Sequence, residues 1–233
     1  MKTLKYRSDE PELMDDPKID KKLISKNLGE LDLLNRYTGG HAVTLQGVKT
    51  LIGENKIYTV VDLGCGSGDA LKYLAKWGRK NSVKLKLIGV DNNIHAIQYL
   101  KRNCMGFPEI SGIVMDYGEY LMNSPPTDIF MCNLFCHHLD NNSLLELFKA
   151  LRKKARVGFV INDLQRSKIS YYSVWFLTRL LNGSELAKND GPVSVNKGFL
   201  REELEQLLVQ SGHAYFSIQK KWAFRYLVVG RIN

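Results

Sequence analysis

Apolar and polar positions alternate along the chain in two recurring patterns, short continuous apolar runs and longer stretches with helical spacing. Apolar residues recur every three or four positions over 19–37 and over 42–52, which predicts two amphipathic helices before the first strand. After them, apolar runs alternate with helical segments, an order typical of an α/β protein with a mostly parallel sheet. The predicted strands are 59–63, 85–91, 113–117, 127–133, 157–164, 215–221 and 224–230, and the helices among them are 69–80, 93–100, 141–152, 169–181 and 201–211.

The last two predicted strands follow each other with only a short turn between them. Strands joined in this way pair antiparallel, whereas parallel neighbours need a long crossover connection. The pattern therefore predicts a doubly wound, Rossmann-like sheet of seven strands whose last strand is antiparallel.

The first predicted strand runs directly into a glycine turn. Asp62 ends the apolar run, Gly64, Gly66 and Gly68 follow at every second position, and a helical segment begins at once. Glycine accepts positive φ at little cost and lets the backbone approach a ligand closely. A strand, a glycine turn and a helix N-terminus together favour a nucleotide-type binding site.

Acidic residues follow the next two predicted strands. Asp91 ends the second strand, 29 positions after Asp62, and Asp116 ends the third, with Tyr117 beside it. At the carboxyl end of a strand next to the glycine turn, an acid can accept hydrogen bonds from both ribose hydroxyls of a nucleoside. An Asx turn at the strand end is the alternative for Asp116. Capping of the next helix is the alternative for Asn92 or Asn93.

The run D-x-G-x-G-x-G over 62–68 resembles motif I of the class I S-adenosylmethionine-dependent methyltransferases. The dinucleotide fingerprint G-x-G-x-x-G would need a glycine at position 69, where this chain has Asp69, so a nicotinamide-dependent oxidoreductase is disfavoured. The resemblance implies that the glycines pass the amino-acid part of S-adenosylmethionine, that Asp91 binds ribose and that Asp116 binds adenine. The cofactor-binding set that it implies is Asp62, Gly64, Gly66, Gly68, Asp91, Asn92, Asp116, Tyr117 and Asn133.

The exit of the fourth strand, 133–140, is similar to the x-L-H-H-L-x turn of the same family. Histidine, whose ordinary pKa is near ~6.5, can take a proton near neutral pH. His137 or His138 therefore either acts as a general base or only shapes the pocket and the helix start. The candidates for the acceptor side of the site are His41, His138 and Arg166, together with Tyr37.

Four further segments look similar to a bacterial subgroup of these enzymes found beside polyketide-type pathways. They are the chain entry 12–17, the turn 35–40, the strand exit 163–166 and the segment 189–195. The subgroup has a histidine where this chain has Gln165, which puts that histidine's role as a base in doubt here.

The segment 169–181 carries aromatic residues on nearly every side, so it is either a buried core helix or a hydrophobic lid over an aromatic or lipid-like substrate. A loop is expected over 188–195. The domain expectation is an N-terminal helical cap over 1–56 and a methyltransferase domain over 57–233 that contains a helical lid insertion at about 166–200.

Composition changes this picture little. The 233 residues carry a net charge of +9, but the basic residues are scattered, so a solvated surface is favoured over an anionic partner. The four cysteines lack the spacing of a zinc site and no disulfide or metal is expected, although Cys132 and Cys136 are followed by two histidines. The start of the chain lacks the apolar run of a signal peptide, which favours a cytoplasmic protein.

These observations predict an S-adenosylmethionine-dependent methyltransferase that acts on a small apolar or aromatic acceptor, with oxygen as the expected target atom. The alternative from another class is an RNA methyltransferase or a noncatalytic nucleic-acid-binding protein that uses the basic surface.

Overall fold

A seven-stranded sheet lies at the centre of the computed structural model, which describes residues 4–15, 19–53, 56–181 and 183–232. The strands are β1 (Tyr58–Leu63), β2 (Leu85–Asp91), β3 (Ile110–Val114), β4 (Thr127–Asn133), β5 (Ala155–Leu164), β6 (Phe216–Lys221) and β7 (Arg225–Arg231). Their spatial order is β3-β2-β1-β4-β5-β7-β6, and β7 runs antiparallel to both of its neighbours. The prediction of a doubly wound α/β fold with an antiparallel last strand is confirmed.

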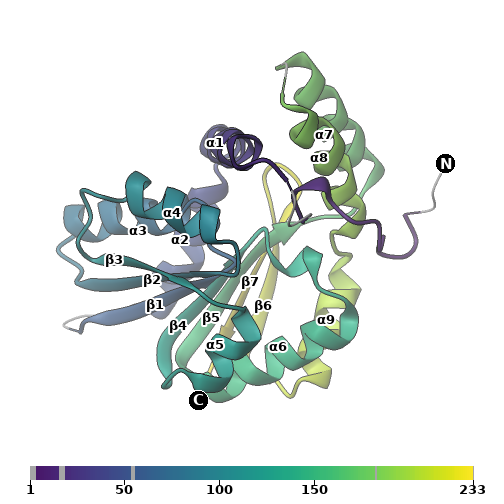
Figure 1. The fold of residues 1–233 in the computed structure, drawn as a ribbon. Helices are drawn as coiled ribbons and strands as arrows, with labels where there is room; N and C mark the ends of the chain where they lie inside the picture. The colour runs from purple at the N-terminus through teal and green to yellow at the C-terminus, as the bar shows by residue number, and fades with distance from the viewer. Residues whose placement is uncertain (1–3, 16–18, 54–55, 182, 233) are drawn as a thin grey trace.

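Helices cover both faces of the sheet (Figure 1). One face carries α2 (Gly40–Leu51), α3 (Asp69–Lys80) and α4 (Ile94–Asn103), and the other carries α5 (Tyr117–Asn123), α6 (Asn141–Lys154) and α9 (Arg201–Gln210). Successive residues of a strand point to opposite faces. On β1, Val60 therefore packs with the first group of helices and Val61 with the second.

The N-terminal helices differ in what they cover. α1 (Lys21–Tyr37) packs on α4, away from the sheet, whereas α2 lies directly against β5 and β7. The glycine at position 47 allows this close contact, because a Cβ there would come within 2.7 Å of Val160 on β5. Of the two described α-helices in the segment expected to form a cap over 1–56, α1 therefore lies off the sheet and α2 lies on it. Asp16 and Pro17 of the predicted entry motif lie outside the described residues.

Two helices follow β5 and project beyond the sheet in Figure 1, α7 (Lys168–Leu180) and α8 (Glu185–Lys197). Among the described residues of α7 only Ser170 is buried, so the core helix, one of the two alternatives for this segment, is excluded. The loop expected over 188–195 is also wrong, because those residues belong to α8 and include Pro192 inside the helix. Among the described residues, no helix is both long and apolar enough to cross a membrane.

Candidate active site

The glycine turn after β1 is held against β2 by backbone hydrogen bonds. Gly64 and Cys65 both donate their N–H groups to the carbonyl oxygen of Val90, at 2.9 and 3.1 Å. Gly64, Gly66 and Gly68 have φ values of 69°, 51° and 76°, a region that costs other residues energy. The structure therefore places all three predicted glycines in the conformation for which the sequence requires glycine.

The three glycines differ in what lies beside them. A Cβ on Gly64 would come within 2.2 Å of the Phe135 ring, and one on Gly68 within 2.6 Å of Leu100. A Cβ on Gly66 would meet nothing closer than Leu28 at 3.5 Å. Gly64 and Gly68 therefore serve packing, while the open space at Gly66 fits a ligand that approaches the backbone closely.

Asp62 lies buried at the end of β1. Asn133 Nδ2, at the end of β4, donates to Asp62 Oδ1 at 3.0 Å, and Thr44 of α2 donates to the amide oxygen of Asn133. Asp62 Oδ2 is buried without a hydrogen-bond partner. Burial raises the pKa of Asp62 to about 8, although the hydrogen bond from Asn133 opposes the shift. This orphaned oxygen is a polar group that a bound ligand can satisfy.

Asp91 curls its carboxylate back over the glycine turn. It accepts from the backbone N–H of Gly66 at 2.9 Å and from that of Asn93 at 2.9 Å, one bond to each oxygen. Burial raises its pKa, while these two bonds and the nearby His138 lower it. A carboxylate has about four acceptor positions, so two remain for a ligand. Asn92 beside it is exposed, and Asn93 caps α4 by accepting from His95 N.

Asp116 lies beyond the end of β3, because the strand ends at Val114 rather than at Tyr117 as predicted. Its side chain accepts from the backbone N–H groups of Gly118 and Glu119 and caps α5. Tyr117 is half-buried and meets the Phe135 ring edge-on, with centroids 5.3 Å apart. The bond from Gly118 N to Asp116 Oδ1 is the Asx turn that is the alternative for Asp116, and it also caps α5. Tyr117 and Phe135 form an aromatic pair beside Gly64.

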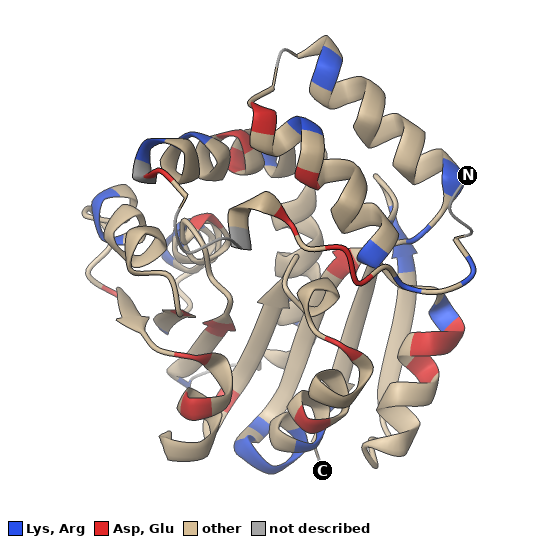
Figure 2. Cartoon of the chain, turned by 45° about the vertical axis from the view of Figure 1, so that its right-hand side comes forward, with Lys and Arg blue, Asp and Glu red and all other residues tan. Residues whose placement is uncertain are grey.

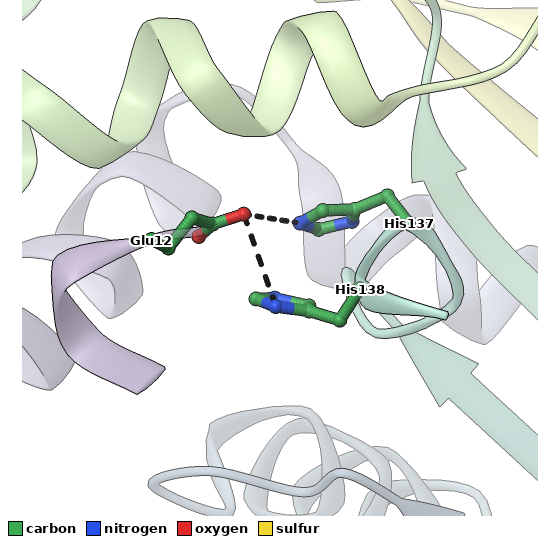
Figure 3. A group of neighbouring side chains, drawn as sticks. All are labelled: Glu12, His137 and His138. Carbon is green, nitrogen blue, oxygen red and sulfur yellow. Dashed lines mark ion pairs between the residues drawn. The ribbon is translucent and has the colours of Figure 1, made fainter. Parts of the chain in front are cut away.

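The turn after β4 delivers two histidines to one buried carboxylate. Leu134 adopts φ 50°, which is unusual for a bulky residue, and the 3-10 helix η2 (Cys136–His138) follows it. Figure 3 shows both imidazole rings pointing toward Glu12, which precedes the short helix η1 (Leu13–Asp15). Glu12 Oε1 lies 3.8 Å from His137 Nε2 and 3.8 Å from His138 Nδ1.

Glu12 is separated from these histidines by more than half of the chain. Contacts made by Asp190 and Arg7 hold its segment beside them. The carboxylate of Asp190, on α8, accepts the backbone N–H groups of Leu13 at 2.8 Å and Met14 at 3.0 Å. Arg7 donates to the carbonyl oxygens of His137 and Leu139 at 3.0 and 2.7 Å. The N-terminal segment is thus fixed across η2, and the insertion that contains α8 forms part of the site.

His137 and His138 have different environments. His137 is buried and its Nδ1 lies 2.7 Å from Asp163 Oδ1, while His138 keeps 22% of its side chain exposed. Burial opposes ionisation of Asp163, but the attraction of His137 and the hydrogen bonds from His137 and the Leu164 N–H outweigh it and lower its pKa. His137 therefore has an anchored orientation, and His138 is the ring with access to a small molecule.

Glu12, His137 and His138 offer three ligand atoms within 4.8 Å of one another, a spacing that a transition-metal ion can bridge. However, the ammonium nitrogen of Lys197 lies 3.4 Å from the same Glu12 oxygen and is nearly buried. A buried cation this close repels a metal ion. We therefore interpret the cluster as a proton-handling group paired with Lys197.

The other two predicted catalytic residues lie elsewhere. His41 is nearly buried, with its Nε2 3.0 Å from Asp32 Oδ1 and its ring 5.8 Å from that of Tyr73. Arg166 is buried and its guanidinium donates to the carbonyl oxygens of Leu4, Lys5 and Gly198 and to the carboxylate of Glu203. An arginine so engaged has no donor to offer an acceptor, so its position is that of a structural clamp, and the expectation that it faces the acceptor is wrong.

Four residues of this site were not among the predicted ones, Glu12, Phe135, Asp163 and Lys197. Glu12 and Asp163 belong to segments that resemble the bacterial subgroup, which was the available signal. Nothing in the local sequence indicates that Lys197 or Phe135 would face them.

A model of the methyltransferase-domain family matches residues 60–158. No curated protein matches the chain significantly in sequence. Among solved structures, the plantazolicin methyltransferase BpumL in complex with SAH has a TM-score of 0.71 at 17% identity, over 94% of this chain and 92% of that one. A SAM-dependent methyltransferase from Aquifex aeolicus has a TM-score of 0.62 at 18% identity, over 93% and 100%.

Human N-acetylserotonin methyltransferase in complex with SAM is also similar, with a TM-score of 0.65 at 12% identity. The likeness covers 92% of this chain but 57% of the human one, so the chain spans little more than half of that protein. At these identities the likeness shows a shared fold. The predicted class I methyltransferase fold is confirmed.

Proposed function

We propose, from the premise that this chain is a class I S-adenosylmethionine-dependent methyltransferase, that it methylates a hydroxyl oxygen on a small, apolar, aromatic acceptor. The donor is S-adenosylmethionine, which supplies an electrophilic methyl group on a sulfonium. The observation that carries the acceptor chemistry is the pairing of His138 with Glu12, whose facing atoms lie 3.8 Å apart.

The residues around the glycine turn fit the donor. The open backbone at Gly66 suits its amino-acid part, and the orphaned Asp62 Oδ2 suits a polar group of the donor there. Asp91 keeps acceptor positions for ribose hydroxyls after bonding Gly66 and Asn93. The aromatic pair of Tyr117 and Phe135 suits a flat base.

The histidine cluster suits the removal of a proton from the acceptor. In the reaction the hydroxyl oxygen attacks the methyl carbon, the carbon–sulfur bond breaks, and the hydroxyl proton passes to His138. Glu12 stabilises the charge that His138 gains, and Asp163 anchors its neighbour His137. Orientation of the two substrates and exclusion of water supply the rest of the acceleration.

The insertion after β5 suits an apolar acceptor. α8 contacts both η1 and η2, and α7 packs along α8. α7, which packs on α8, is rich in aromatic side chains, among them Tyr171. The apolar character of this insertion favours phenols over charged polymers as acceptors.

The surface charge gives nucleic acid little support as the acceptor. Figure 2 shows lysine and arginine segments spread over several helices and loops, with acidic segments among them. A nucleic-acid groove needs basic residues gathered along one track.

The test is methyl transfer from labelled S-adenosylmethionine to an alkylphenol, a polar catechol and a short RNA. We expect the alkylphenol to be methylated on oxygen, with kcat at least ~100-fold lower in His138→Gln and with S-adenosylmethionine affinity unchanged. Glu12→Gln, which removes the charge that faces His138, should also lower kcat. Its matched control is Glu146→Gln, which changes an exposed glutamate on α6 and should leave kcat unaltered. Methylation of RNA alone, or full activity of His138→Gln, would contradict the proposal.

A further inference from the structure

The outward face of α7 carries a stripe of large apolar side chains. Ile169, Tyr172, Phe176 and Leu180 are 69%, 54%, 58% and 65% exposed. Their spacing of three, four and four positions places them on one side of a helix. The opposite side of α7 packs on α8, where Gly191 lies against Val174 and Thr178. An exposed apolar stripe of this extent marks an interaction surface.

Positive charge borders this stripe. Lys168 lies at the start of α7 and Arg179 in its last turn, with the Arg179 guanidinium 4.2 Å from the centroid of the Trp175 ring. The thirteen residues of α7 include no aspartate or glutamate. The exposed face of α7 is therefore complementary to an anionic surface.

α7 lies at the periphery of the fold rather than against the sheet (Figure 1). In Figure 1 the paired helices α7 and α8 project beyond the sheet. With thirteen residues, α7 is too short to span a bilayer. A helix with aromatic and aliphatic residues on one face and lysine or arginine at its borders lies in the headgroup region of a membrane, where long basic side chains reach the phosphates.

We propose that the outward face of α7, formed by Ile169, Tyr172, Phe176 and Leu180, docks this protein on an anionic lipid surface. Docking requires no methyl transfer, so it goes beyond the proposed function. It also places the insertion beside an apolar phase from which a lipid-like acceptor can be taken.

The test is co-sedimentation of the full chain with vesicles of phosphatidylcholine, with and without phosphatidylglycerol. We expect partition into the anionic vesicles to exceed partition into the neutral ones and to fall with salt. The double variant Phe176→Glu with Leu180→Glu should lose at least ~tenfold in partition. The double variant Met122→Glu with Val209→Glu is the matched control, because it adds the same charge at exposed apolar positions on α5 and α9.

A second variant pair keeps the result interpretable. Circular dichroism must show the same helix content for all proteins, and Lys168→Ala with Arg179→Ala should reduce the preference for anionic vesicles without a change in fold. Equal partition of the α7 variant and its control would overturn the proposal, as would failure of the wild-type chain to bind vesicles. Neither experiment involves donor or acceptor, so these failures leave the proposed function standing.

Discussion

His137 Nδ1 lies 2.7 Å from Asp163 Oδ1, and the other oxygen of Asp163 accepts the backbone N–H of His137 at 3.2 Å. The carboxylate thus holds both the ring and the backbone of the turn that carries the candidate base. Such a buried, fully bonded carboxylate orients a histidine more firmly than packing alone.

Replacing Asp163 with asparagine should both destabilise the protein and lower its activity. The change removes the carboxylate that accepts the hydrogen bonds of the buried His137, which costs about 2 kcal/mol of unfolding free energy. The measurement is urea unfolding at neutral pH, together with kcat. Asp140→Asn, at an exposed helix cap, is the control and should cost no more than about 1 kcal/mol. A similar small cost for Asp163→Asn would contradict the anchoring role.

The glycine turn allows a separation of packing from ligand contact. Gly66→Ala and Gly39→Ala both place alanine at positive φ with space for the new methyl group, so each should cost about 1 kcal/mol of stability. S-adenosylmethionine binding, measured by calorimetry, should weaken for Gly66→Ala alone. Gly64→Ala should lose several kcal/mol because its Cβ overlaps the Phe135 ring. Equal donor affinity for both open-space variants would argue against backbone contact at Gly66.

The raised pKa of Asp62 predicts a specific pH dependence. An unfolded aspartate ionises near ~3.9, whereas Asp62 keeps its proton to about pH 8 in the folded chain. Between these two pKa values the folded state binds more protons than the unfolded state. Asp62 therefore makes the free energy of unfolding fall as pH rises, by at most ~1.4 kcal/mol per pH unit. Above the folded pKa its contribution is constant.

Asp62→Asn removes this titration. The variant should therefore gain stability relative to the wild type as pH rises from about 5 to about 8. Thermal unfolding of both proteins across that range measures the difference. Parallel curves would show that Asp62 does not hold a proton near neutral pH.

Asp190 controls the position of Glu12 from a distance. Asp190→Ala frees the backbone N–H groups of Leu13 and Met14, so Glu12 should leave the histidines and kcat should fall at least ~tenfold with donor affinity unchanged. Glu185→Gln changes an exposed carboxylate of the same helix and is the matched control. If both variants keep full activity, the placement of Glu12 does not matter to turnover.

Local patterns predicted most of the fold. The apolar runs and helical spacing located α3, β2 and β4 at their observed bounds, because each has one face or both faces in the core. The third strand was placed three residues late, since Ser111 and Gly112 interrupt its apolar run while hydrogen bonding to β2 keeps them in the strand.

The remaining differences arise from contacts that no local pattern contains. The sequence 189–192 is typical of a turn, yet it lies in α8, where Asp190 bonds η1 and Pro192 is buried. Tertiary packing therefore overrides a helix breaker. Arg166 ends a strand exit that resembles the bacterial subgroup, which predicts that it faces the acceptor, but its partners lie near residue 4 and near residue 200.

The candidate site also has a part that local sequence patterns predict and a part that depends on tertiary contacts. The glycines and acids of the donor side follow strand ends and were predicted in kind. The cluster of Glu12 with His137 and His138 joins residues from opposite halves of the chain, a pairing that only the fold reveals.

The binding of S-adenosylmethionine at the glycine turn and Asp91 is measured by calorimetry. S-adenosylmethionine is titrated calorimetrically into the wild-type chain, into Asp91→Ala and into the control Asp140→Ala, whose aspartate is exposed at the N-cap of α6. The account predicts binding by the wild type and the control, and at least ~tenfold weaker binding by Asp91→Ala. Equal affinity of all three proteins, or no binding by the wild type, would contradict it.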